Sequence, residues 1–207
     1  MPPMNVSLAA SSEATTVNDL LVQRVTNTPE QPALYHSVEN HWKEVSWKDY
    51  ANRIDIVSQA LLGHGLEQGD KVAIIGRNTL DWFVTDMAIM CAGLVSVPIY
   101  ETSSNDQILY ILQHSSSKVL FVENRTYLDR ILNVLHDAPL LKTIIIQTGD
   151  TGESALVKTQ VTFLGSGNKT RKHILEKARH EISASTIATL IYTSGTTGHP
   201  KAVILSH

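Results

Sequence analysis

Four short apolar segments constrain the fold of this chain more than any other feature of its sequence. Each is almost continuously apolar and lacks the alternating polar residues of a strand that has one solvated face. Each is separated from the next by a stretch long enough for a helix. Strands that alternate with helices in this way form a parallel sheet built from right-handed crossover units. The segments are KVAIIG (71–76), LVSVPIY (94–100), KVLFVEN (118–124) and LKTIIIQ (141–147).

Three helices are expected between these strands, over residues 79–93, 104–115 and 125–139. The second of them begins with Ser104 and has Gln107 three residues later, which is the spacing of a capping box. Because the strands are apolar on both sides, helices must cover both faces of the sheet. The sequence therefore predicts an α/β fold, a mostly parallel sheet with helices on both faces.

The residues before the first of these strands predict three further elements. Apolar residues recur at helical spacing over 17–27, which favours a short helix. ALYHS and HWKEVS alternate in polarity around VEN, a pattern typical of a hairpin. Ser46 begins a longer amphipathic helix that Gly63 and Gly65 end.

The chain divides into four parts on this basis. We expect a disordered N-terminus over 1–16, an α/β subdomain over 17–147, a variable connection over 148–185 and a last segment over 186–207. The connection is expected to be exposed and to contain a basic helix from about Thr170 to Glu181.

Composition excludes several classes of protein. The formal net charge of -3 over 207 residues gives no basic excess that would attract nucleic acid. The single cysteine, Cys91, cannot form an internal disulfide and is expected to be buried. The N-terminus lacks the basic and apolar regions of a secretory signal, so a cytoplasmic location is expected. No apolar run reaches the length of a transmembrane segment, whereas peripheral contact with a membrane stays open.

Three possible sites are set aside. Gly76 follows a strand, where a dinucleotide-binding turn would begin, but GRNTLD lacks the other two glycines of that motif. SSSK at 115–118 has the spacing of a serine acylase motif without its accompanying elements, so a structural role is expected. The nine histidines are scattered, and no metal site is predicted from them.

The segment TSGTTGHPK lies between the apolar strands TIATLIY and AVIL and has an unusual composition. Its hydroxyl groups are hydrogen-bond donors, and its lysine adds a mobile positive charge. Its glycines permit positive φ and close approach of the backbone to a ligand, and successive N–H groups can bind an anion. The combination favours a phosphate-binding loop. The residues concerned are Thr193, Ser194, Gly195, Thr196, Thr197, Gly198 and Lys201.

Two other interpretations of this loop explain less. A hairpin turn rich in Ser, Thr and Gly accounts for the glycines, but it has no need of four hydroxyl groups and a lysine. A P-loop has glycine directly before the lysine and a helix after it, whereas here Pro200 precedes Lys201 and a strand follows. Without a helix N-terminus, the hydroxyls, the amides and Lys201 must hold the phosphate themselves.

The segment YTSGTTGHPKAVILSH closely resembles the phosphate-loop signature of the adenylate-forming superfamily, whose usual form is YTSGTTGxPKGV. That superfamily contains the acyl-CoA synthetases, the luciferases and the adenylation domains of peptide synthetases. Residues 46–104 resemble the N-terminal subdomain of these enzymes. VPIYETSS, at 97–104, is similar to the long-chain fatty acyl-CoA synthetase branch, and the resemblance covers roughly Asp19 to the C-terminus.

The resemblance implies an ATP-dependent long-chain fatty acid–CoA ligase that uses ATP, Mg²⁺ and coenzyme A. It implies that residues 193–198 surround the β- and γ-phosphates of ATP and that Lys201 contacts the same triphosphate. Such enzymes form an acyl-adenylate with release of pyrophosphate and then pass the acyl group to coenzyme A. Donors fixed in advance stabilise the charge that accumulates on the departing pyrophosphate. The resemblance assigns no metal ligand within this segment.

The sequence departs from the family pattern in two respects. Ala202 stands where the family usually has glycine. If that position requires positive φ, the methyl group costs about 1 kcal/mol and displaces Lys201. In addition, the family's acidic Mg²⁺ motif, its ribose-binding aspartate and its C-terminal domain with a catalytic lysine all follow the phosphate loop. We therefore interpret the chain as an N-terminal fragment in which 186–207 begins the ATP-binding part.

Two alternatives to a ligase for long-chain fatty acids stay open. One is a non-catalytic remnant that binds nucleotide weakly. The other is an adenylating enzyme for a different carboxylic acid, such as an aryl or amino acid.

Overall fold

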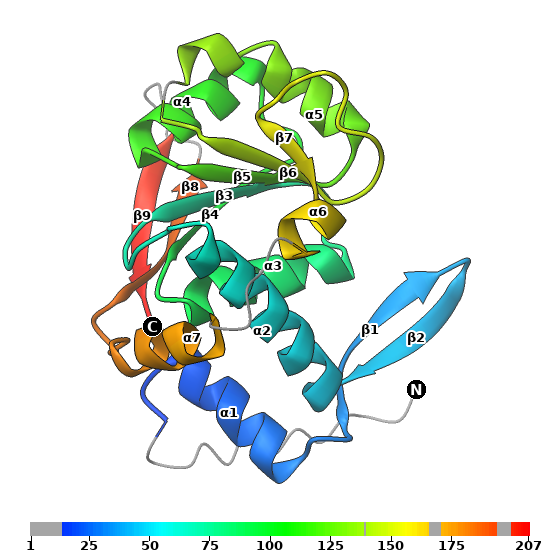
Figure 1. Ribbon diagram of the computed structural model, residues 1–207, viewed down its shortest axis with the longest axis vertical. Helices are drawn as coiled ribbons and strands as arrows, with labels where there is room; N and C mark the ends of the chain where they lie inside the picture. The colour runs from blue at the N-terminus through cyan, green and yellow to red at the C-terminus, as the bar shows by residue number, and fades with distance from the viewer. Residues whose placement is uncertain (1–13, 139, 166–170, 194–199) are drawn as a thin grey trace.

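The computed structural model describes residues 14–138, 140–165, 171–193 and 200–207. Its centre is a seven-stranded sheet in the order β7-β6-β5-β3-β4-β8-β9 (Figure 1). The neighbouring strands are parallel except β8 and β9, which are antiparallel. The predicted α/β fold is confirmed. The strands are β3 (Lys71–Ile75), β4 (Val95–Ile99), β5 (Val119–Val122), β6 (Thr143–Ile146), β7 (Val157–Thr159), β8 (Ile187–Thr193) and β9 (Lys201–Ser206).

Helices cover both faces of this sheet, because successive strand residues point to opposite sides. Val72 and Ile74 of β3 enter one core with α1, α2 and α3, whereas Ala73 and Ile75 enter a second core with α4 and α5. Figure 1 shows the two groups of helices on either side of the strands. The helices are α1 (Val17–Asn27), α2 (Trp47–Gly63), α3 (Leu80–Cys91), α4 (Asn105–Ser115) and α5 (Arg125–Leu132).

The elements predicted before the sheet are present. β1 (Pro32–Val38) pairs antiparallel with β2 (His41–Ser46), and the hairpin projects from the body of the molecule (Figure 1). Its turn places Glu39 and Asn40 at φ values of 49° and 64°, as a tight two-residue turn requires. Ser46 caps α2 by accepting a hydrogen bond of 3.1 Å from the backbone N–H of Asp49.

The predicted capping box of α4 is confirmed. The Ser104 hydroxyl accepts from the Gln107 backbone N–H at 3.2 Å, and the Gln107 side chain accepts from the Ser104 N–H at 2.9 Å. α4 ends at Ser115, and Ser116, which caps it, has a left-handed backbone with φ of 57°.

The connection between β6 and β8 contains more structure than the sequence predicts. β7 extends the sheet by pairing parallel with β6, and α6 (Gln160–Gly165) buries Phe163 completely. The prediction of an exposed connection is therefore wrong at Val157 and Phe163, which are buried. A three-residue strand and a six-residue helix are too short to show a hydrophobic period. The predicted basic helix is present as α7 (Arg171–His180).

The helix predicted over 125–139 is shorter than expected. α5 ends at Leu132, and a separate 3₁₀ turn follows at Leu135–Asp137. Ala138 has φ of -114° and ψ of 66°, outside the helical region. The next residue in the sequence is proline, which disfavours a helical conformation of the residue before it.

Cys91 is completely buried beside α2, as the sequence predicts. Burial raises the pKa of its thiol to about 11, so the group stays protonated at neutral pH. Over the described ranges, no helix combines the length and the apolarity needed to cross a lipid bilayer.

Candidate functional site

The carboxyl ends of β3, β4 and β8 meet at one edge of the sheet, where the chain diverges. After β3 the chain continues into α3 on one face, and after β4 it continues into α4 on the other face. In open α/β sheets, ligands bind in the crevice that such a divergence creates. A crevice of about 390 Å³ lies here, with walls that include Trp82, Tyr100 and Ile191.

The two described ends of the predicted phosphate loop lie at the same edge. Thr193 ends β8 and Lys201 begins β9, and the antiparallel register places these two residues opposite each other. Both residues are exposed. Ser194, Gly195, Thr196, Thr197 and Gly198 lie outside the described residues. The structure thus brings together the first and last residues of the predicted site at the rim of the crevice region.

A second, smaller cavity of about 200 Å³ has in its wall Tyr192 and Pro200, the residues directly before Thr193 and Lys201. Tyr192 is only 3% exposed, and its hydroxyl shares a hydrogen bond of 2.8 Å with Nδ1 of His114 on α4. Burial, together with the neighbouring Tyr110, raises the pKa of the Tyr192 hydroxyl. Tyr192 is therefore neutral and fixed in the core directly before Thr193.

An ion pair closes the β3 side of the crevice. The Arg77 side chain donates to Glu123 at the end of β5 from Nε at 2.9 Å and from Nη2 at 2.5 Å, and the Arg77 backbone N–H donates to Oε2 at 2.7 Å. Burial would raise the pKa of Glu123, but these hydrogen bonds and the positive charge lower it below its usual value. The carboxylate is therefore ionised at neutral pH.

Gly76 permits this contact. It has φ of 152°, and a Cβ at this position would lie 2.6 Å from Cβ of Glu123. Glycine here allows the turn after β3 to approach the end of β5. It is not needed for a dinucleotide motif.

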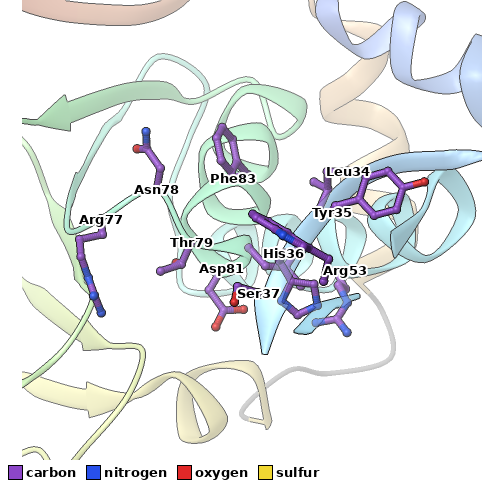
Figure 2. A pocket seen from close by; sticks show the side chains of 12 residues that line it. Leu34, Tyr35, His36, Ser37, Arg53, Arg77, Asn78, Thr79, Asp81 and Phe83 are labelled. Carbon is purple, nitrogen blue, oxygen red and sulfur yellow. The ribbon is translucent and has the colours of Figure 1, made fainter. Parts of the chain in front are cut away.

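A groove of about 740 Å³ separates the hairpin from the beginning of α3. Figure 2 shows Tyr35 and His36 of β1 and Arg53 of α2 on one side, with Arg77 and Asp81 on the other. Arg77 thus borders both this groove and the crevice. The groove contains positive, negative and aromatic side chains, so its lining alone does not select one class of ligand.

The side chains of SSSK at 115–118, which was set aside as a catalytic motif, contact other residues of the core and the surface. Ser115 and Ser117 are buried and share a hydrogen bond of 2.7 Å, and Lys118 pairs with Asp70 at 2.6 Å. Across the described part of the chain, no three His, Cys, Asp or Glu side chains gather in a way that could hold a metal ion.

Ala202 does not have the positive φ that was considered for it because the family motif usually has glycine at this position. It lies inside β9 opposite Tyr192, is absent from the positive-φ residues and packs against the second core. The methyl group therefore causes no left-handed strain, and the expected displacement of Lys201 on that ground is wrong.

Sequence reasoning missed Arg77, Glu123 and Tyr192. Arg77 and Glu123 each follow the apolar part of a parallel strand, at the edge where ligands bind, and that position was an available signal. Tyr192 is the first residue of the motif YTSGTTGHPK, but it was assigned to the preceding apolar strand, because a tyrosine there is equally typical of a core residue.

Residues 21–207 match the protein family described as AMP-binding enzyme, and the chain belongs to that family. It is 32% identical over 199 residues to the long-chain-fatty-acid–CoA ligase ACSBG2 of Xenopus laevis, covering 96% of this chain and 27% of that protein. It is also 32% identical over 169 residues to the long-chain-fatty-acid–CoA ligase FadD15 of Mycobacterium tuberculosis, covering 82% of this chain and 27% of that protein. The chain thus spans about a quarter of the length of these relatives.

Solved structures show the same fold. A putative long-chain-fatty-acid CoA ligase from Rhodopseudomonas palustris superposes with a TM-score of 0.74 at 21% identity, covering 92% of this chain and 44% of that one. The anthranilate CoA ligase AuaEII, in complex with anthranoyl-AMP, superposes with a TM-score of 0.73 at 21% identity, covering 91% of this chain and 34% of that one.

Proposed function

We propose that this chain carries the triphosphate-binding part of an ATP-dependent long-chain fatty acid–CoA ligase. The observation that carries the proposal is the pairing of Thr193 with Lys201 at the carboxyl edge of the sheet. Both side chains are exposed there, beside the crevice. Membership of the AMP-binding enzyme family and the names of the relatives support this assignment.

The loop from Thr193 to Gly198 is proposed to bind the β- and γ-phosphates through hydroxyl and backbone N–H groups. Lys201 is proposed to add a positive charge to the same triphosphate and to stabilise charge in the transition state. Because a strand, β9, follows the loop, the phosphate receives no help from a helix N-terminus. The hydroxyl groups and Lys201 are therefore expected to account for most of the affinity.

The proposed reaction has two steps. The fatty acid carboxylate attacks the α-phosphorus of ATP, a P–O bond to the β-phosphate breaks, and pyrophosphate leaves. The thiol of coenzyme A then attacks the acyl carbon, loses its proton, and displaces AMP. Negative charge grows on the departing pyrophosphate in the first step, so donors positioned on the β- and γ-phosphates lower its barrier.

Mg²⁺ is part of the proposal as the ion that accompanies the triphosphate. The described residues supply no carboxylate cluster for it, so none of them is assigned as its ligand. Fatty acid, ATP and coenzyme A are the proposed substrates. A cytoplasmic location, peripheral contact with a membrane and the division at residues 147 and 185 also remain proposals.

The test is the affinity of the 207-residue chain for MgATP. Replacement Lys201→Met should weaken binding about tenfold to a hundredfold, because a hydrogen bond to a charged group contributes about 1.5–3 kcal/mol. Lys172→Met is the matched control, since Lys172 is exposed on α7, and this variant should bind as the wild type does. Isothermal titration calorimetry gives both dissociation constants.

Catalysis is tested by exchange of labelled pyrophosphate into ATP with palmitate, anthranilate or an amino acid as the acid substrate. Exchange that depends on palmitate supports the proposal. MgATP binding without exchange would favour the non-catalytic remnant, and exchange only with the aryl or amino acid would favour the other alternative. Equal MgATP affinities of wild type and Lys201→Met would contradict the proposed role of the loop.

A further inference from the structure

The carboxyl end of β8 has registered sheet pairs on one side only, with β9. Among the described residues, the parallel ladder between β4 and β8 contains one registered pair, Ser96 with Thr189. The Thr189 hydroxyl reinforces this pair by donating to the Ser96 carbonyl at 3.0 Å. On its other side β8 pairs with β9, which is the edge strand. From Leu190 onward the described residues give no registered pair between β8 and β4, so side-chain contacts of β8 contribute to its position relative to β4.

Tyr192 supplies such a contact through α4. Its ring packs edge-on against His114 with centroids 5.7 Å apart, and its hydroxyl and Nδ1 of His114 are 2.8 Å apart. Tyr110, one turn earlier on α4, stacks on His114 with centroids 5.3 Å apart. Tyr110, His114 and Tyr192 thus form a short aromatic row that joins α4 to the end of β8.

The far end of α4 holds His114 in place. Ser116 caps the helix in a left-handed conformation, and Ser115 and Ser117 are buried and hydrogen-bonded to each other on either side of it. The segment SSSK, for which the sequence predicts a structural role, therefore lies at the base of the aromatic row. An apolar side chain could fill the volume of Tyr192 in this largely apolar core. The buried hydroxyl of Tyr192, however, must form a hydrogen bond, and the position of His114 fixes the direction of that bond.

The position of Tyr192 determines the position of the proposed phosphate-binding residues. Thr193 is the next residue, and Tyr192 pairs across the ladder with Ala202, the residue after Lys201. A displacement of Tyr192 therefore moves Thr193 through the chain and Lys201 through the β8–β9 ladder. We propose that the Tyr192–His114 hydrogen bond positions Thr193 and Lys201 for the triphosphate, and this inference rests on the function proposed above.

Four variants of the 207-residue chain test the positioning role. Tyr192→Phe and His114→Phe keep an aromatic ring and remove the hydrogen bond, and each should weaken MgATP binding about fivefold, the equivalent of one neutral hydrogen bond. The double variant should bind no more weakly than Tyr192→Phe alone, because that single variant already removes the hydrogen bond that His114→Phe removes. His114→Asn places a side-chain amide near the position of Nδ1, so it keeps a hydrogen-bond partner for Tyr192. The MgATP affinity of this variant should be within about twofold of that of the wild type.

The matched control is Tyr50→Phe. The Tyr50 hydroxyl is also a buried donor, to the Phe83 carbonyl at 3.0 Å, but it lies in the other core. This variant should lose stability, measured by urea denaturation, without a change in MgATP affinity. A merely structural role of Tyr192 predicts that Tyr192→Phe behaves like the control, and that result would overturn the inference.

A second measurement separates this inference from the proposed function. The amide resonances of Thr193 and Lys201 in ¹⁵N-labelled, ligand-free chain should shift in His114→Phe and remain in place in Tyr50→Phe. If the wild type does not bind MgATP, the proposed function fails for this chain, while these shifts still support the positioning role. Unchanged resonances in His114→Phe would overturn it, whether or not MgATP binds.

Discussion

Glu123 is a nearly buried carboxylate whose charge is compensated by one arginine, Arg77. It is only 5% exposed, at the end of β5, yet it accepts hydrogen bonds from both the side chain and the backbone of Arg77. Arg77 remains largely in solvent, with 68% of its side chain exposed. The pair therefore avoids most of the desolvation penalty of a fully buried ion pair.

We expect the ionisation of Glu123 to make stability depend on pH. Its pKa is lower in the folded protein than the ordinary value of 4.5, so its contribution is present above pH 4.5 and is lost as pH falls through the folded value. Glu123→Gln should therefore lose less free energy of unfolding than the wild type between pH 6 and pH 3. At pH 6 the variant should be less stable by about 1–2 kcal/mol, because a charged hydrogen bond is lost.

Urea denaturation at each pH measures this difference. The other carboxylates are common to both proteins, so their contributions cancel in the comparison. If the free energy of unfolding declined equally in wild type and variant, the contact with Arg77 would not lower the pKa of Glu123.

At the scale of the element, α6 shows how a short segment completes a core. Phe163 lies flat on His64 with ring centroids 4.4 Å apart and meets Phe121 of β5 at 5.8 Å and 90°. These contacts join α6 to the end of α2 and to the middle of the sheet. The six residues of α6 hold a fully buried aromatic ring where the sequence predicts an exposed connection.

Phe163→Ala should lower the free energy of unfolding by about 3–5 kcal/mol, because it removes a buried ring and leaves a cavity. Val161→Ala on the same helix is the control. Val161 is 81% exposed, so its change should be within about 0.5 kcal/mol. Equal midpoints of urea denaturation for the two variants would mean that α6 does not pack as described.

At the scale of the whole molecule, α7 packs beside α2, and an ion pair joins the two helices. Nη2 of Arg179 lies 2.6 Å from Oδ1 of Asp55 on α2, across 124 positions of sequence. The two side chains are 20% and 39% exposed, so the pair is partly shielded from water. It joins the connection that precedes the phosphate loop to the first half of the chain.

Arg179→Met should lower the free energy of unfolding by about 1–3 kcal/mol, because Asp55 loses its partner in a half-buried position. Asp55→Asn should have an effect of similar size, and the double variant should lose less than the sum of the two. Chemical denaturation of the four proteins measures this coupling. Strict additivity would show that the pair does not connect the two parts.

The parallel sheet could be predicted because its signal is local. The runs that contain Val72, Phe121 and Ile145 are apolar on both sides and are separated by helix-length stretches with caps such as Ser104. The short elements β7 and α6 could not be predicted, because an element of so few residues shows no hydrophobic periodicity. Their places depend on the contacts of Val157 and Phe163 with distant strands.

The sequence by itself determined the α/β class, the helix caps, the hairpin, and the choice of Thr193 and Lys201 as candidate site residues, because spacing and residue type express all of these. Only the tertiary structure brought Arg77 to Glu123, His114 to Tyr192 and Arg179 to Asp55. Each pair joins residues more than forty positions apart. Which of many possible partners a side chain meets depends on how the crossovers place the strands and helices, and no local pattern records that.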